Sequence, residues 1–198
     1  MQLTEIRIAG FGGQGVILAA MIVGKAAAIF QGGYATLTQA FGPEARGGAS
    51  SAQVILSDEP ILYPYVTQPH VLVVMSQEAY TRFAPELREG GLLIVEEELV
   101  HIDELRSGIR VHSVPATRLA EELGKRMVLN VVMVGFFAAV TGLLDPDALR
   151  QAVGDSVPPA TRELNLRAFD KGFDYGLLKM HAPVEAAEQE HPSPSLEA

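Results

Sequence analysis

Residues 8–16 read Ile-Ala-Gly-Phe-Gly-Gly-Gln-Gly-Val, a glycine-rich stretch that decides the fold. Before it, residues 5–10 start with alternating polar and apolar side chains and end apolar, which predicts a strand entering a turn. After it, residues 14–30 are apolar on every side, with Lys25 as their one charge, which predicts a buried helix. A strand, a glycine turn and a helix in this order predict an α/β domain.

The glycine turn has the spacing of a phosphate site. It satisfies the Gly-x-Gly-x-x-Gly pattern between a strand and a helix, where an anion meets the free N–H groups of the helix. In this pattern the glycines permit the tight turn, the approach of a ligand to the backbone, and close packing of helix on strand. We therefore expect a phosphate-bearing ligand here, and the alternative is a turn that serves packing alone. The residues assigned to this contact are Gly10, Phe11, Gly12, Gly13, Gln14 and Gly15.

Strands and helices alternate along the rest of the chain. Ser76 and Asp145 are expected to cap the helices that follow them. The pattern predicts a three-layer αβα domain with a mostly parallel sheet. The helical C-terminal third, from Thr117, is expected to pack on one side as an appendage. Strands are expected at residues 34–38, 50–57, 70–75, 92–95 and 110–114, and helices at 77–87, from 117, 127–144, from 145 and 159–179.

The composition is that of one globular domain with a tail. The chain has 198 residues, of which 48% are hydrophobic and 20% charged, and we assign residues 1–180 to the domain. Residues 181–198 contain no aromatic residue and combine prolines with four glutamates, at 185, 188, 190 and 197. Such a segment buries too little apolar surface to offset its ordering entropy, so we expect a disordered acidic tail.

Charge and cysteine content exclude several classes of function. A net charge of −9 argues against a nucleic-acid partner, which would require a basic surface. The chain has no cysteine, so it holds no disulfide, iron–sulfur cluster or thiolate zinc site of its own. No secretory signal is visible, and we expect a cytoplasmic protein. Residues 127–144 are nearly all apolar, but Asn130, Thr141 and two glycines interrupt them, which favours a buried helix over a membrane span.

The identity of the ligand depends on residues that follow the turn. A dinucleotide fold carries an acidic residue at the end of its second strand, where it holds the ribose hydroxyls. No acidic residue lies between Glu5 and Glu44, so the NAD(P) hypothesis lacks that residue. A Walker phosphate loop is excluded because no Gly-Lys-Ser/Thr follows the glycines.

A second group of candidate residues lies in residues 41–48. Arg46 stands between Glu44 and the pair Gly47-Gly48, directly before a predicted strand. An arginine offers planar, bidentate recognition of a phosphate or carboxylate, and the glycines let a ligand come close to the backbone. The alternative is a surface ion pair between Arg46 and Glu44. Because the loop follows the second strand, we expect it on the same edge of the sheet as the glycine turn.

Together the two motifs resemble the gamma subunit of the 2-oxoacid:ferredoxin oxidoreductases. That family carries a Gly-x-Gly-Gly-Gln-Gly-Val turn and, downstream, an aromatic-Gly-Pro-Glu-x-Arg-Gly-Gly loop. Here these are residues 10–16 and residues 41–48. The resemblance covers about residues 3–177 and continues at Ser57–Ile61, Gly90–Ile94, Asn130, Asn165–Phe169 and Gly172.

The resemblance implies a subunit of a larger enzyme. The family oxidatively decarboxylates a 2-oxoacid on thiamine diphosphate, passes electrons through iron–sulfur clusters to ferredoxin, and transfers the acyl group to coenzyme A. The resemblance implies that thiamine diphosphate with its Mg and the clusters lie on partner subunits, or in other domains of fused family members, which agrees with a chain that lacks cysteine. The gamma subunit is associated with coenzyme A, so the turn and the Arg46 loop are expected to meet that molecule.

The substrate and the role of the chain have alternatives at this point. The Gly-Pro-Glu-x-Arg-Gly-Gly sequence of the Arg46 loop resembles that of family members that act on 2-oxoglutarate, which favours this substrate. Pyruvate, branched 2-oxoacids and indolepyruvate stay open as substrates. Two other functions stay open: a stand-alone NAD(P)-dependent oxidoreductase, and a non-catalytic assembly subunit whose turn serves packing.

No residue has the pattern of a catalytic base or metal site. His70, His101 and His112 are scattered along strands and loops without a partner in sequence. The run Glu96-Glu97-Glu98 is expected to be a solvated loop rather than a metal site. The two helices that are apolar on all sides, at 16–30 and 127–144, predict contact with another chain. A layer buried within this chain is the alternative.

Overall fold

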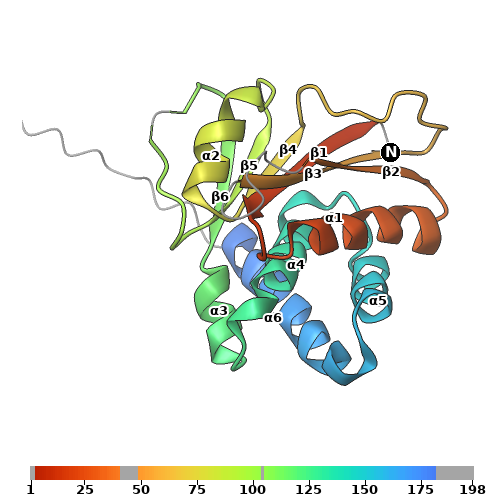
Figure 1. The fold of residues 1–198 in the computed structure, drawn as a ribbon, viewed down its shortest axis with the longest axis vertical. Coiled ribbons are helices and arrows are strands. Elements are labelled where there is room, and N and C mark those ends of the chain that lie inside the picture. The colour runs from red at the N-terminus through yellow and green to blue at the C-terminus, as the bar shows by residue number, and fades with distance from the viewer. Residues whose placement is uncertain (1–2, 41–48, 104, 182–198) are drawn as a thin grey trace, which may run out of the picture.

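A six-stranded sheet forms the centre of the molecule (Figure 1). The computed structural model describes residues 3–40, 49–103 and 105–181. The order across the sheet is β2-β3-β1-β4-β5-β6, in which β1, β4, β5 and β6 run parallel while β3 runs antiparallel to both β1 and β2. The predicted α/β fold with a mostly parallel sheet is thereby confirmed. The strands are β1 (Thr4–Phe11), β2 (Tyr34–Ala40), β3 (Ala49–Ser57), β4 (Val71–Val74), β5 (Leu92–Glu96) and β6 (Arg110–Val114).

The helices begin where the capping signals predict. Ser76 Oγ accepts a hydrogen bond from the Ala79 N–H at 3.3 Å, and Asp145 Oδ1 accepts one from the Asp147 N–H at 2.8 Å. Both bonds satisfy N–H groups that the first helical turn leaves free. The helices are α1 (Val16–Lys25) with its π-helical extension η1 (Ala26–Phe30), α2 (Gln77–Phe83), α3 (Ala116–Glu122), α4 (Leu129–Thr141), α5 (Pro146–Ser156) and α6 (Arg162–His181).

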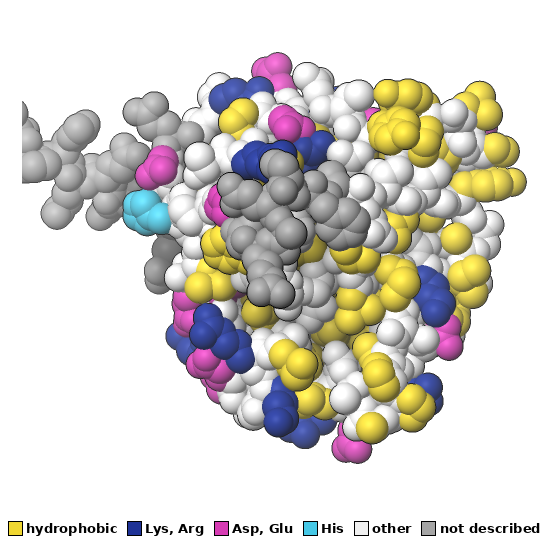
Figure 2. Space-filling view, in the orientation of Figure 1, with side chains coloured by type: hydrophobic (Ala, Val, Ile, Leu, Met, Phe, Trp, Pro, Cys, Tyr) yellow, Lys and Arg dark blue, Asp and Glu magenta, His cyan; other side chains and the backbone are white. Residues whose placement is uncertain are grey.

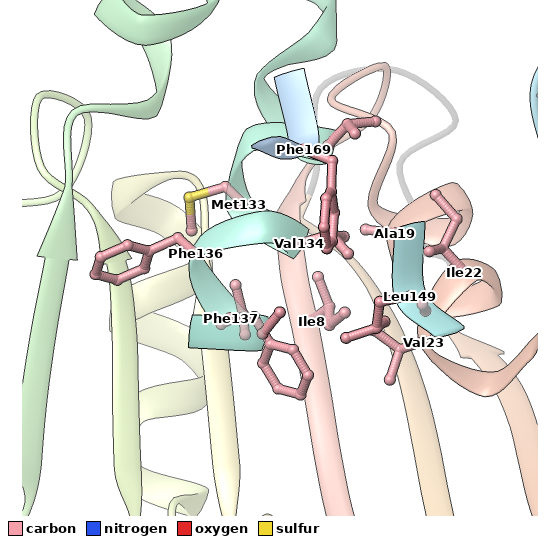
Figure 3. Packing of buried hydrophobic residues seen from close by; sticks show 14 of the residues in the cluster. Ile8, Ala19, Ile22, Val23, Met133, Val134, Phe136, Phe137, Leu149 and Phe169 are labelled. Carbon is pink, nitrogen blue, oxygen red and sulfur yellow. The ribbon is translucent and has the colours of Figure 1, made fainter. Parts of the chain in front are cut away.

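The two faces of the sheet carry unequal layers. One face is covered by α2 and part of the segment between β5 and β6, and the other by α1, α4, α5 and α6 (Figure 1). On the thicker side, side chains from those four helices converge over β1 (Figure 3). Ala52, Val54 and Leu56 of β3 all face this core, as their alternation predicts. The helical C-terminal third packs on one side, as predicted, and supplies much of the main core.

Helices α4 and α6 cross with their backbones in contact. A Cβ atom added to Gly135 would lie 2.0 Å from the Phe169 carbonyl oxygen, and one added to Gly172 would lie 2.0 Å from that of Val132. Residues 129–138 of α4 are all buried. The apolar surface of α4 is therefore buried within this chain, which was the alternative to the predicted contact with another subunit. Among the described residues, no helix is both long and apolar enough to cross a membrane.

Two predicted segments fall outside the described residues. They are the Arg46 loop at 41–48 and the tail at 182–198. The disorder of the tail and the contacts of Glu44, Arg46, Gly47 and Gly48 stay predictions.

Candidate functional site

The glycine turn lies at the carboxyl edge of the sheet. β1 ends at Phe11, the turn follows, and α1 begins at Val16. The parallel strand β4 ends beside it, because Ala9 pairs with Val74. Ligands of open α/β sheets bind outside this edge of the strands.

The ends of β2 and β3 that flank residues 41–48 also lie at this edge. Ala49, the first residue of β3, pairs with Phe11 of β1, and Ala40, the last of β2, pairs with Ser51. The Ala49 N–H donates to Glu78 Oε1 of α2 at 3.1 Å, which ties the start of β3 to the neighbouring helix. The flanks of the Arg46 loop are therefore on the edge where the sequence placed the loop.

Gln14 closes the turn from inside. Its Oε1 accepts a hydrogen bond from the Phe11 N–H at 2.6 Å, and its Nε2 donates to the Met75 carbonyl oxygen at 2.8 Å. Its own N–H donates to the Phe11 carbonyl oxygen at 3.1 Å. The side chain thus connects the start of the turn to the residue after β4 by two hydrogen bonds, and the backbone bond adds a third that fixes the loop.

Asn130 supports the turn from α4. This side chain is 3% exposed, and its Nδ2 donates to the Gly15 carbonyl oxygen at 3.2 Å. Gly15 has φ 72°, and a Cβ atom there would lie 2.3 Å from the same Nδ2. Sequence reasoning singled out Asn130 only through the resemblance, since a contact across 115 positions leaves no local pattern.

The outer surface of the turn is open. Phe11, Gly12 and Gly13 are exposed, and a Cβ atom added to either glycine would meet nothing within 4 Å in the described structure. α1 starts without a side-chain cap among the described residues and without an acidic residue in its first turn. Free N–H groups at a helix start that no described side chain caps are suited to binding an anion.

Glu96 corrects the interpretation of the acidic run. The sequence predicts a solvated loop, but Glu96 is fully buried at the end of β5, while Glu97 and Glu98 are exposed. Its carboxylate accepts N–H groups of Glu98 at 2.9 Å, Leu99 at 2.6 Å and Thr117 at 2.9 Å. Three such donors replace the lost hydration, so the group orders the start of α3 and the loop after β5. Within the described ranges, no cluster of three or more potential metal ligands occurs.

The three histidines lie away from the glycine turn in sequence and serve different contacts. His70 precedes β4, at the opposite edge of the sheet, and its Nδ1 accepts the Glu5 N–H at 3.1 Å. Burial and the charge of Arg88 lower the pKa of His70, against an opposing effect of Glu5. Burial and two cations, Arg110 and Lys179, lower the pKa of His112 in β6. His101 is exposed.

Comparison with known proteins adds three findings. Residues 5–175 match the pyruvate ferredoxin/flavodoxin oxidoreductase family. The 2-oxoglutarate synthase subunit KorC of Methanothermobacter thermautotrophicus is 50% identical over 174 residues, which are 85% of this chain and 92% of that subunit. The gamma subunit of a keto/oxoacid ferredoxin oxidoreductase from Geobacter sulfurreducens is similar in structure, with a TM-score of 0.80 and 38% identity over 89% of this chain and 98% of that one.

A further relative carries the domain within a longer chain. The ketoisovalerate oxidoreductase subunit VorA of Methanothermobacter marburgensis is 33% identical over 175 residues. These are 86% of the present chain but 36% of VorA.

Proposed function

The chain belongs to the pyruvate ferredoxin/flavodoxin oxidoreductase family and is a gamma-type subunit of an oxoacid oxidoreductase, and we propose that its complex oxidises 2-oxoglutarate with coenzyme A. In such a reaction the 2-oxoacid anion and the thiol of coenzyme A give a thioester, CO₂, one proton and two electrons. Thiamine diphosphate with Mg supplies the decarboxylation chemistry on a partner subunit. Iron–sulfur clusters on partner subunits carry the electrons singly to ferredoxin.

The similarity to KorC carries the assignment of the substrate. Identity is 50% to that 2-oxoglutarate synthase subunit and 33% to the ketoisovalerate subunit VorA over domains of nearly the same length. A gamma subunit must fit the subunits with which it assembles, so its sequence follows the specificity of its complex. This supports 2-oxoglutarate over branched 2-oxoacids.

Substrate choice is tested on the assembled complex. Reduction of a viologen dye is followed with 2-oxoglutarate, pyruvate and 2-oxoisovalerate, each with and without coenzyme A. A site that pairs the distal carboxylate rejects substrates lacking it, so we expect kcat/KM for 2-oxoglutarate to exceed the others by about 100-fold or more. A preference for pyruvate or 2-oxoisovalerate would contradict the assignment.

This chain's own contribution, we propose, is to bind coenzyme A at the glycine turn and the Arg46 loop. The open N–H groups at the start of α1 suit a phosphate of the coenzyme. Arg46, beside Glu44, Gly47 and Gly48, would form the second wall, and the strand ends that flank this loop lie at the same edge. Coenzyme A offers phosphates without requiring the ribose-binding acid that the sequence lacks.

Gly12→Val separates ligand binding from packing. The added side chain points into open space, so the fold tolerates it, but it blocks the approach to the turn. We expect the Kd of the complex for coenzyme A, measured by calorimetry, to rise about tenfold or more, equivalent to about 1.4 kcal/mol. Arg46→Ala should raise the Kd as well, because it removes a charge-assisted contact.

A matched control uses an arginine at the other edge. Arg88 is exposed, and its backbone N–H donates a hydrogen bond to the carbonyl oxygen of Pro69, just before β4. Arg88→Ala should therefore leave the Kd for coenzyme A unchanged. If Gly12→Val and Arg46→Ala bind coenzyme A as the unmodified complex does, the chain is an assembly subunit. Stoichiometric binding of NADH to the chain would instead favour the NAD(P) hypothesis.

A further inference from the structure

β2 is an exposed edge strand without the protection that edge strands usually carry. It lies at the end of the sheet and, among the described strands, pairs with β3 alone. Its sequence, Tyr-Ala-Thr-Leu-Thr-Gln-Ala, contains neither a charge nor a proline. Edge strands of soluble proteins are commonly protected by lysine, proline or a bulge, because their free N–H and C=O groups attract other strands. The opposite edge, β6, carries Arg110 and His112.

Apolar side chains border β2 on the helical side of the sheet. Leu37 of β2, Met21 of α1 and Ile29 of η1 are exposed, Ile29 by 68%. They line a groove of about 310 Å³ between the strand and the helix. Among the described residues that line the groove, Lys25 carries the one charge, and it forms an ion pair with Asp155 of α5 at 2.5 Å.

A loop with aromatic side chains borders β2 on the other side. Leu62, Tyr63 and Tyr65 are 96%, 61% and 57% exposed. The loop is held in place, because the Val66 N–H donates to Gln53 Oε1 of β3 at 3.0 Å. Thr38 of β2 donates to the same oxygen at 3.2 Å. The loop therefore lies beside β2 as part of one surface.

These exposed residues lie around β2, and we call them together the β2 surface, defined as Met21, Ile29, Tyr34, Leu37, Leu62, Tyr63 and Tyr65. Hydrophobic side chains gather over β2, the end of α1 and the loop after β3 on the right of the view (Figure 2). Tyrosine and large aliphatic side chains around a free strand edge are the composition of protein interfaces. Several large apolar side chains exposed around one strand edge favour a site of association.

We propose that the β2 surface docks a partner subunit of the oxidoreductase, through an extended segment paired with β2 and apolar side chains placed in the groove. The proposal rests on the proposed function, since it requires those subunits. VorA supports this partner, because there a homologous domain is joined to a further two thirds of one polypeptide. In the described lining of the groove the cation Lys25 is paired with Asp155, which disfavours an anionic membrane as the partner.

The β2 surface leaves the proposed coenzyme site open. Tyr34 and the loop after Ser57 lie at the amino edge of β1, because Tyr34 pairs with Ser57 and the neighbouring Leu56 pairs with Thr4. The glycine turn lies at the other edge, after Phe11. Docking at β2 therefore allows the complex to form while the start of α1 faces a ligand.

The test measures assembly of the full chain with its partner subunits. Leu62→Lys and Ile29→Lys each place a charge on one side of β2, and both sites are so exposed that the isolated chain should keep its melting temperature. We expect each substitution to raise the Kd of assembly about tenfold or more. The matched control is Leu178→Lys on α6, a leucine 72% exposed and outside the β2 surface, which should assemble normally.

The outcomes distinguish the docking surface from the function. Normal assembly of both β2-surface variants overturns the docking proposal and leaves the function intact. Equal weakening by Leu178→Lys also overturns it, since the effect would not depend on the site. A chain that forms a homodimer lost in Leu62→Lys assigns the surface to a second copy, which overturns the proposed partner. Failure of the unmodified chain to join any oxidoreductase subunit would overturn the function itself.

Discussion

Gly15 is the residue of the turn that the structure constrains most. Its φ of 72° favours glycine, and the space for a Cβ atom is filled by the Asn130 amide at 2.3 Å. Gly15→Ala must therefore adopt a strained backbone and displace a buried side chain. We expect the free energy of unfolding, from urea denaturation, to fall by about 1–3 kcal/mol.

Gly12→Ala provides the control for that substitution. Gly12 has no unusual φ and open space around its Cβ position, so its replacement should change the free energy of unfolding by less than about 0.5 kcal/mol. Equal stability of Gly15→Ala and the unmodified chain would show that Asn130 can move aside without cost.

For single residues, the sequence predicts the role of those whose contacts lie within a few positions along the chain. The glycine spacing identifies the turn, and Ser76 and Asp145 are identified as caps, because each acts within a few positions of itself. The contact of Asn130 with Gly15 joins α4 to the start of α1 and has no local signature. Glu96 was wrongly predicted as solvated, since its donor Thr117 lies 21 positions away and comes close only when β5 and α3 are in place.

Among the helices and strands, the contact between α4 and α6 allows a clear prediction about stability. Gly172→Ala would place a methyl group 2.0 Å from the Val132 carbonyl oxygen, which belongs to a buried backbone that cannot rotate away. The two helices must separate, and the core between them loses contacts. We expect the free energy of unfolding to fall by about 3 kcal/mol, measured by urea denaturation.

Gly154→Ala in α5 should have the opposite sign. A Cβ atom there meets its nearest neighbour, in Leu166, at an ordinary 3.6 Å, and the position is helical. Alanine favours the helix over glycine, so stability should rise by about 0.5–1 kcal/mol. If both substitutions destabilise equally, contact distance does not govern the cost.

Element positions follow from periodicity, whereas their arrangement does not. The predicted helix at residues 14–30 corresponds to α1 and η1, and the predicted helix at 127–144 contains α4. Periodicity cannot give the order of strands, so the position of β2 at the edge appears only in the structure. Nor does it show that α6 covers α4, which is why the apolar α4 also suggested contact with a second chain.

For the molecule as a whole, the sheet separates two proposed roles. The glycine turn follows β1 at the carboxyl edge, and the β2 surface surrounds the strand at one end of the sheet. The sequence predicts the first, because a ligand turn is a local motif. It does not predict the second, whose members come from α1, η1, β2 and a loop after β3.

The dependence of overall stability on pH follows from two histidines, His70 directly before β4 and His112 in β6. Burial, with nearby cations, lowers the pKa of His70 and of His112 below 6.5 in the folded state. The unfolded chain therefore binds protons more readily than the folded chain in this range, so stability rises with pH. The contribution is present above the unfolded pKa and is lost as pH falls through about 6.5 toward the folded values. We expect the melting temperature to be lower at pH 5.5 than at pH 7.5.

His70→Asn tests the origin of that change. Its amide oxygen can still accept the Glu5 N–H, which His70 Nδ1 accepts in the structure, but the side chain does not titrate. The difference in melting temperature between the two pH values should therefore shrink. A difference that persists in full when both His70 and His112 are replaced would assign the pH dependence to other groups.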